Sequence, residues 1–480
     1  MGYADESQVI TLHNNAIESP TFIKATSRLK RNESQQSEPI RNDAATLAED
    51  IDIETLKNKY ISPYNYTQDP IAYNMGISSV AGPNGTYHVG LSQIDTSNIF
   101  FDSSAVSRYD LIGQAWGQTG RFHGFAVGAG LQSAVVVQQS KTAGYNTTGV
   151  LSLEQAYLDY EYKDAFEITG GNILLTTPWV NSIGSFPGAT YANGNNTYQG
   201  VTTNIQVAPS LLLTGFRAFT YLQYPNEDFQ ATNLYNTNGG PMANLGNTTT
   251  SGVGGVGGIW NPSDNYNLNV WFYQFYDYAD MWYADNQYTL QLSKSVSFIF
   301  GAQFVNQSSN GSAITSTLLK PDSTTQTLGG INSNAVGLKW SIKAGDNTTT
   351  FAYNNVFGAQ NSYLGGGIVT PYTYGLETDP LYTTPALNSI AELGSGSAYL
   401  IKNSMSFMDN SLKASLAFAQ FFVNQTYANQ ANLITEYDAA LQYTIPKTAL
   451  NLWSRVVYVS QPDYAGGDFW QPRIIINYNF

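Results

Sequence analysis

From about Thr86 to Phe480 the sequence consists of strand-like segments that come in pairs, and this arrangement limits what the chain can fold into. The two members of a pair are joined by a few polar residues, such as Lys163-Asp164 and Asp409-Asn410. Successive pairs are separated by longer stretches rich in Gly, Asn, Ser and Thr. Lipid permits strands only in a closed cylinder without free edges, and such cylinders have short turns at one end and long loops at the other. The pattern therefore predicts an all-β fold, a transmembrane antiparallel β-barrel, rather than a soluble β-sandwich.

Eighteen candidate strands follow this pattern, and an even number is expected of bacterial barrels. We predict them at about 86–95, 107–118, 121–136, 151–163, 165–176, 197–209, 211–222, 252–262, 265–277, 280–294, 296–307, 331–344, 347–359, 397–408, 411–424, 433–445, 448–460 and 470–480. Eight short turns join the strands in pairs, and nine connections at the opposite end are mostly longer, with 278–279 as the exception. This order places both ends of the barrel on the short-turn side. In outer-membrane barrels that side is the periplasm, and the long loops are extracellular.

Several strands alternate between apolar and polar residues with a period of two, which places the two sets on opposite faces of the sheet. Tyr437 and Leu441, for example, share one face of their strand, whereas Glu436 and Asp438 share the other. We expect the apolar set to face lipid and the polar set to face the lumen.

The composition agrees with a barrel in a membrane. Charged residues make up 12% of the chain, against roughly 25% in soluble proteins, and aromatic residues reach 14%. Few charges and many aromatic residues suit a surface in contact with lipid, with aromatic belts at the interfaces. No run approaches about 18 consecutive apolar residues, so we predict no transmembrane helix. The net charge of −14 argues against a nucleic-acid partner, and the absence of Cys excludes disulfides and thiolate metal sites.

Residues 1–59 differ from residues 60–480 because they are rich in polar and charged residues and lack the strand pattern. The run Ser27–Glu38 has the composition of a linker, and Asp43 is a candidate cap for a short helix over about 44–58. We therefore predict a flexible N-terminal extension, interpreted either as a mobile tail or as a periplasmic segment or plug that enters the lumen, followed by the barrel. No basic segment followed by an apolar run opens the chain, so we expect that the signal for outer-membrane delivery has been removed.

The sequence contains no group of residues that supports catalysis. His13, His88 and His123 are too scattered for a recognisable metal site. No G-x-S-x-G elbow occurs, and the glycine-rich run 252–258 lacks the Lys-Ser/Thr of a phosphate-binding loop. We therefore expect no catalytic residue, no metal and no cofactor, and we predict that the chain is not an enzyme.

The charges that remain on the predicted strands point most directly to function. An Arg or Lys that faces lipid at mid-membrane costs roughly 2–4 kcal/mol, so such residues should face the lumen or lie near a rim. The residues predicted to line the lumen are Arg108, Asp110, Arg217, Lys339, Lys343, Glu436, Asp438, Arg455 and Arg473. Arg217 is ambiguous by alternation, and we place it inside because of its charge alone. The lining is interpreted either as an electrostatic filter that selects solutes or as charges that only keep the interior hydrated.

Three neighbouring stretches carry a resemblance to a known family: Leu153–Tyr160, Thr176–Asn181 and Tyr198–Val201. Asp379–Thr384 is similar to a further segment of that family, and the last strand, Pro472–Phe480, ends on an aromatic residue as outer-membrane barrels typically do. On these segments the chain resembles the OprD-type outer-membrane porins.

The resemblance covers about residues 60–480 and implies a barrel of about eighteen strands, monomeric or trimeric, that passes small solutes such as carboxylates or basic amino acids. It also implies that loops 177–196 and 360–396 fold into the barrel and narrow the pore. The candidate constriction residues on these loops are Pro178, Trp179, Asn181, Asp379 and Pro380. The family has a column of basic lumen residues, whereas the chain from residue 60 onward contains only five Arg, so it departs from the family there.

Our leading hypothesis is a passive porin in the outer membrane of a Gram-negative bacterium, in which small hydrophilic solutes or ions cross a loop-constricted aqueous lumen. Its partners are then these solutes and outer-membrane lipid, and both a monomer and a homotrimer fit. The alternative is a structural or adhesive surface protein whose barrel is a scaffold for loops 223–251, 308–330 and 360–396. An open lumen lined by charge favours transport, whereas a lumen filled by loops favours the scaffold.

Overall fold

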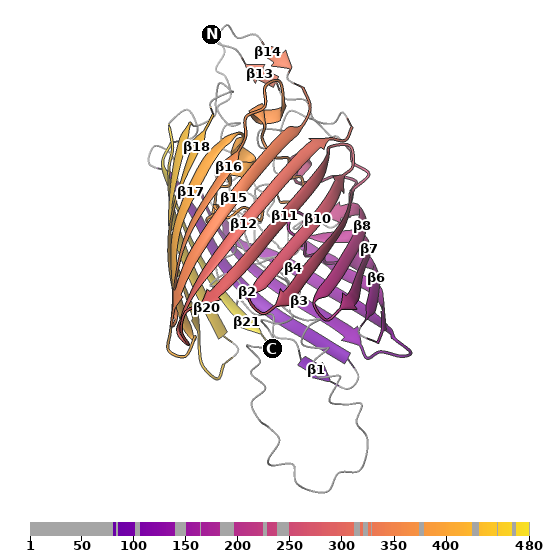
Figure 1. The fold of residues 1–480 in the computed structure, drawn as a ribbon. Helices are drawn as coiled ribbons and strands as arrows, with labels where there is room; N and C mark the ends of the chain where they lie inside the picture. The colour runs from indigo at the N-terminus through magenta and orange to yellow at the C-terminus, as the bar shows by residue number, and fades with distance from the viewer. Residues whose placement is uncertain are drawn as a thin grey trace.

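The computed structural model (Figure 1) describes most of the chain after residue 79. The described residues are 80–82, 85–100, 106–139, 150–163, 165–182, 196–223, 228–237, 249–311, 317–319, 325–327, 329–373, 379–424, 432–448, 450–462 and 467–479. The predicted N-terminal extension, 1–59, lies outside these residues, so its division from the barrel stays a prediction.

Strands dominate the described residues. They are β1 (Val80–Gly82), β2 (Gly85–Phe100), β3 (Val106–Thr119), β4 (Phe125–Gln139), β5 (Val150–Tyr162), β6 (Phe166–Ile173), β7 (Thr197–Ala208), β8 (Leu211–Leu222), β9 (Val253–Ser263), β10 (Tyr266–Phe275), β11 (Ala279–Gln291), β12 (Val296–Ser309), β13 (Thr317–Leu319), β14 (Thr325–Thr327), β15 (Asn332–Ala344), β16 (Asn347–Val356), β17 (Gly396–Phe407), β18 (Leu412–Val423), β19 (Leu433–Thr444), β20 (Leu450–Ser460) and β21 (Phe469–Asn479). The helical segments are α3 (Leu234–Thr237), η5 (Tyr363–Gly365) and α4 (Ile390–Leu393). In the part of the chain that the structure describes, no helix has the length and apolar character needed to span a membrane.

Eighteen long strands, β2 to β12 and β15 to β21, form one sheet of antiparallel neighbours. Each pairs with the next long strand in the chain, and β12 pairs with β15 across the loop that holds the β13–β14 hairpin. β2 is hydrogen-bonded to β3 on one side and to β21 on the other, with Gly90 opposite Asn479 and Phe100 opposite Phe469. Every one of these strands therefore has a partner on both sides, and the predicted barrel of about eighteen strands is confirmed.

The two faces of the sheet differ as the alternation predicts. On β15, Leu338, Trp340 and Ile342 are 53%, 45% and 37% exposed, whereas Lys339 and Ser341 are 9% and 4% exposed. Exposed large apolar side chains recur on β3 to β12, on β15 and on β17 to β21. Soluble monomers do not leave an apolar surface of this extent in water, so the outer face requires an apolar surrounding.

The short connections lie at the end of the barrel where β21 ends, and the long loops lie at the other end (Figure 1). Several turn residues have the left-handed backbone that tight turns need, with φ of 49° at Lys163, 59° at Gly345 and 65° at Asn410. Both predicted features, the asymmetry between the two ends and the position of the C-terminal strand end, are therefore observed.

The structure moves several predicted strand boundaries: β2 and β4 extend to Phe100 and Gln139 rather than 95 and 136, and β11 and β16 end at Gln291 and Val356 rather than 294 and 359. The start of β4 and the end of β6 also move. The strand expected to begin at residue 121 begins at Phe125, because Phe122 and Phe125 bond to each other around a turn with positive φ at His123 and Gly124. The strand expected to end at residue 176 ends at Ile173, and residues 177–182 of the following loop are buried.

The exposed face of β15 provides a test of membrane embedding. Leu338 lies at the middle of the strand and Ile342 near its short-turn end. Leu338→Arg should lower the free energy of unfolding by roughly 2–4 kcal/mol, whereas Ile342→Arg should cost about 0–1 kcal/mol, because the penalty falls toward the interface. Urea unfolding in lipid vesicles measures both. Equal costs at the two depths would contradict a lipid-facing outer surface.

Candidate functional site

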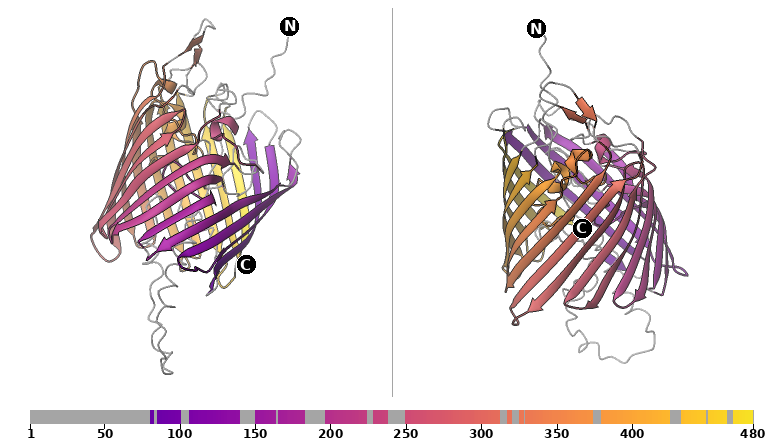
Figure 2. Two further views of the ribbon diagram at one scale, coloured as in Figure 1. Left: turned by 90° about the vertical axis from the view of Figure 1, so that its right-hand side faces the viewer. Right: turned by 45° about the horizontal axis from the view of Figure 1, so that its top comes forward.

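The loop between β16 and β17, residues 357–395, folds into the barrel (Figure 2, right). Nearly all of its described residues from 362 onward are buried. Its first attachment is to Gln307 on β12, whose side-chain amide bonds to both backbone groups of Val369: Nε2 donates to the carbonyl and Oε1 accepts from the N–H, each at 2.8 Å. A wall side chain thus replaces the strand partner that this backbone lacks.

A second attachment lies on three adjacent strands. Gln303 on β12, Gly337 on β15 and Asn354 on β16 stand side by side in register. A Cβ at Gly337 would lie 2.4 Å from Gln303 Oε1, so only glycine leaves room for the bond from Asn354 Nδ2 to Gln303 Oε1 at 2.7 Å. Gln303 and Asn354 then bind the backbone of residues 380–383, and we call these two side chains the amide seat. Their bonds join Gln303 Nε2 to Pro380 O (2.9 Å), Tyr382 N to Gln303 Oε1 (2.9 Å) and Thr383 N to Asn354 Oδ1 (3.0 Å).

Residues 379–391 of the loop, which include the segment bound by the amide seat, are also held by hydrogen bonds within the loop itself. Asp379, which is fully buried, accepts hydrogen bonds from Leu381 N at 3.1 Å and from Thr384 Oγ1 at 2.9 Å. Burial raises the pKa of Asp379, while hydrogen bonds from Ser389, Leu381 and Thr384 act in the opposite direction. Ser389 also caps α4 by accepting from Ala391 N at 3.2 Å. Asp379 therefore shapes the loop from inside, and its place at a constriction stays a prediction.

The loop reaches β19 and β20 at residues 386–388. The buried carboxylate of Glu436 accepts from the backbone N–H groups of Ala386, Leu387 and Asn388 at 3.0, 2.6 and 3.0 Å. Arg455 on β20 donates from Nη1 to the carbonyl of Ala386 at 3.3 Å. The expected inward orientation of both charged side chains is therefore what the structure has.

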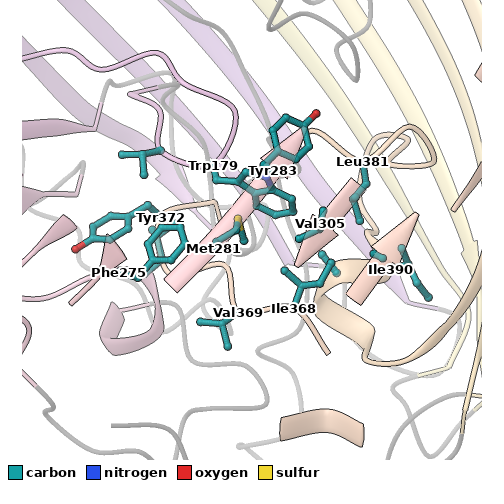
Figure 3. Close-up of a cluster of buried hydrophobic side chains, with 14 of the residues drawn as sticks. Trp179, Phe275, Met281, Tyr283, Val305, Ile368, Val369, Tyr372, Leu381 and Ile390 are labelled. Carbon is teal, nitrogen blue, oxygen red and sulfur yellow. The ribbon is translucent and has the colours of Figure 1, made fainter. Parts of the chain in front are cut away.

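The loop between β6 and β7 also turns inward, and residues 174–182 of it are described. Trp179 is fully buried and its ring lies edge-on to Tyr283, with centroids 6.0 Å apart (Figure 3). The hydroxyl of Tyr198 donates to the carbonyl of Asn181 at 3.1 Å, which ties the loop to β7. Pro178 is buried beside them.

Aromatic side chains of the wall support both inward loops. Trp271, Tyr273 and Phe275 on β10 stack in a column, with centroids 5.4 and 5.8 Å apart. Phe275 and Tyr198 in turn contact Tyr372 of the β16–β17 loop, with centroids 6.2 and 5.9 Å apart. These rings, together with Met281, Val305, Ile368, Leu381 and Ile390, belong to one buried apolar cluster (Figure 3). Both inward loops therefore pack against apolar side chains on the inner face of β7 to β12.

The inner face also carries charge of both signs, on and beside β5, β6, β20 and β21. Arg455 and Arg473 face each other on β20 and β21 and are 5% and 1% exposed. On β5 and β6, the buried carboxylates of Asp159, Glu161 and Glu167 gather around Arg121. The Nε of Arg121 lies 2.8 Å from Glu161 Oε2, and its Nη2 lies 3.8 Å from Glu167 Oε1. Sequence reasoning did not single out this cluster, although Glu161 and Glu167 face each other in register.

Lys339 and Lys343 both lie on the inward face of β15 but in different surroundings. Lys339 is buried: its Nζ donates to Gln287 Oε1 at 3.2 Å and lies 4.7 Å from the ring centroid of Tyr382 in the inward loop. Lys343 is exposed near the short-turn end of the strand. Arg108 and Asp110 lie on β3, but their side chains are outside what the structure describes, so their inward orientation stays a prediction.

Arg217 lies on the outer face of the barrel, which corrects its predicted place in the lumen. It shares the face of β8 that carries Leu213 and Phe219, which are 38% and 53% exposed. Its guanidinium carbon lies 4.6 Å from the ring centroid of Phe219 and 4.1 Å from that of Tyr276. It donates to the carbonyls of Ala218, Ser251 and Val253. The prediction from charge alone was wrong for two reasons. Backbone carbonyls near the loop end of β8 accept hydrogen bonds from the guanidinium, and the free-energy cost of a lipid-facing Arg is small near the membrane interface.

Asp438 faces the lumen two residues from Glu436, and its Oδ1 is buried without a hydrogen-bond partner among the described residues.

Sequence reasoning missed Gln303, Gln307 and Asn354, the neutral side chains that hold the loop. The alternation along their strands could have placed them on the inner face. Nothing near them in the sequence, however, marks them as partners of the loop backbone, which lies more than 25 residues away in the chain. Within the described residues, no three or more His, Asp or Glu side chains gather as a metal site.

The ring of strands and the inward loops define a closed antiparallel β-barrel of eighteen strands. Solved structures with the same fold include Acinetobacter baumannii OccAB4, at 15% identity and a TM-score of 0.64 over 83% of this chain and 98% of that one. Pseudomonas aeruginosa OpdQ is similar at 13% identity, a TM-score of 0.65 and coverage of 83% and 99%. The Pseudomonas aeruginosa outer membrane protein OpdK is similar at 15% identity, a TM-score of 0.62 and coverage of 83% and 98%. No protein-family model and no curated protein matches the chain.

The Arg121 cluster provides a test of the lumen's charge arrangement. Arg121→Ala should lower the free energy of unfolding by about 3 kcal/mol at pH 7, because it leaves buried carboxylates without their cation. Adding Glu161→Gln should restore part of the loss, because it relieves the repulsion between the facing Glu161 and Glu167. Lys294→Ala, at an exposed turn position, is the control and should change stability by less than about 0.5 kcal/mol. Additive losses in the double variant would contradict this account.

Proposed function

We propose that the protein is a passive porin of the bacterial outer membrane, in which small hydrophilic solutes cross a lumen narrowed by the β6–β7 and β16–β17 loops. The observation that carries the proposal is the contrast between the two faces of one closed sheet. The outer face presents large apolar side chains, whereas the side of the lumen along β20, β21, β5 and β6 is lined by buried charged and amide groups. A polar interior inside an apolar cylinder suits a water-filled path.

The comparisons support the same proposal. The resemblance of Leu153–Tyr160 and Asp379–Thr384 to OprD-type porins agrees with the shared fold of OccAB4, OpdQ and OpdK, so we place the chain with these proteins. One solved structure is of OpdK with vanillate, a small carboxylate. Lys343 is an exposed positive charge on the inward face of β15 and suits an anionic group, while the three carboxylates around Arg121 leave an excess of negative charge that suits a cationic one. The proposed substrates are therefore small polar solutes that carry charge.

Reconstitution into planar lipid bilayers tests the proposal directly. The purified protein should produce discrete conductance steps, because a fixed aqueous lumen admits ions at a constant rate. The same detergent without protein is the control. A complete absence of steps from correctly folded protein would reject the porin function, and liposome swelling with amino acids, organic acids and sugars would then rank the solutes of an active channel.

Lys343 provides a test of charge selection in the lumen. Lys343→Gln should shift the reversal potential in a salt gradient toward cation preference, because it removes an exposed positive charge from the inward face near the short-turn end. Lys447→Gln makes the same change on an exposed turn outside the strands and should shift the potential less. Equal shifts would show that net charge, rather than position in the lumen, determines the preference.

A further inference from the structure

The β16–β17 loop is attached to β19 and β20 through Glu436 and Arg455, and this charged attachment differs in kind from the amide seat. Three consecutive backbone N–H groups, those of residues 386, 387 and 388, converge on the one carboxylate of Glu436, and Asn388 Nδ2 donates to it as well. Successive N–H groups that point at one spot form a concave anion site of the kind that proteins use for phosphate and carboxylate ligands. Here the anion that occupies the site is a side chain of the barrel wall.

The neighbouring strand holds the same turn through its carbonyl. Arg455 donates to Ala386 O through Nη1, and its Nη2 donates to Gln471 Oε1 at 3.3 Å, which fixes the guanidinium against β21. Two adjacent strands therefore hold both the donors and an acceptor of one turn. Hydrogen bonds to an ionised group are stronger than those between neutral groups, so this attachment depends on the charge of Glu436 in a way that the amide seat does not.

The loop reaches far around the lumen between its attachments. Leu234 N and Pro371 O are joined by a hydrogen bond of 3.0 Å, which links the loop to the segment that contains α3. Residues 380–383 bind β12 and β16, and residues 386–388 bind β19 and β20. Beyond them, Gly394 and Gly396 have φ of 112° and 153°, at the junction with β17. Loss of the charged attachment would free the part of the loop between the amide seat and this junction.

We propose that Glu436 is a positioning residue, a latch that keeps residues 384–393 on the β19–β20 side of the lumen and so sets the width of the pore. The proposal rests on the porin function for its consequence, but the latch itself is a property of the fold. Glu436→Gln tests it, because an amide keeps the size of the carboxylate but replaces one of its two acceptor oxygens with a donor. Two of the four donors then lose their acceptor.

The primary readout is the accessibility of the loop. The chain contains no Cys, so Ala386→Cys introduces a single thiol at a position that is 8% exposed. In the Glu436→Gln background, this introduced thiol should react with a maleimide roughly tenfold faster, the factor that corresponds to the loss of about one charge-assisted hydrogen bond. Glu167→Gln is the matched control: it makes the same change on the inner face of β6, where Glu167 accepts a hydrogen bond from Asn204 of β7 and lies 3.8 Å from Arg121. We expect it to leave the reaction rate of the introduced thiol unchanged.

The second readout is the single-channel conductance, which should be larger and noisier for Glu436→Gln than for the unmodified protein. An unchanged thiol reaction rate together with unchanged conductance would overturn the latch, provided that urea unfolding shows that the variant folds. If Glu167→Gln accelerates the reaction as much as Glu436→Gln, charge in the lumen rather than the latch controls the loop, and the proposal is also overturned. A faster thiol reaction in a protein that never conducts would support the latch while rejecting the porin function.

Discussion

Hydrogen bonding of the backbone is the constraint on which this structure depends. Within hydrocarbon every N–H and C=O needs a partner, and the ring of eighteen strands provides one on both sides of each strand. The loops that enter the lumen bring further backbone groups that have no strand beside them. Gln307, Gln303, Asn354 and Glu436 bind those groups, so part of the polar inner face serves the loop rather than a solute.

Apolar packing decides which side of the lumen the loops fill. The stacked rings on β10 offer a flat surface, and Tyr372, Trp179 and the aliphatic residues of the β16–β17 loop cover it (Figure 3). Burial of these side chains drives the loops onto β7 to β12, because apolar surface leaves water wherever a complementary surface exists. The cluster also includes Tyr157 of β5, Val457 of β20 and Phe469 of β21, which lie on strands that carry the charged residues of the lumen. The inner face therefore combines apolar packing for the loops with buried charged groups on neighbouring positions of the same strands.

Much of the fold follows from local patterns in the sequence. Period-two alternation and turn residues predicted the strands closely, because both act within a few residues and the lipid face admits only apolar side chains. The errors lie where a longer-range interaction decides the backbone. Arg121 to Gly124 form a turn beside the carboxylates of β5 and β6, and the strand after residue 165 ends early because Trp179 packs against Tyr283. Arg217 was misplaced because its partners are carbonyls of a neighbouring strand and loop.

The candidate site was harder to predict, because alternation gives the face of a residue but not its partner. Glu436 and Asp438 share a face and a charge, yet only the first meets three backbone N–H groups of the loop. Lys339 and Lys343 differ in the same way, since Tyr382 of the loop covers Lys339 whereas Lys343 stays exposed. What separates the members of each pair is their position relative to an inward loop that is attached through residues far away in the chain. A lumen charge can act on a solute only where the loop has not already engaged it, so the loop's attachments determine which charges remain available for selection.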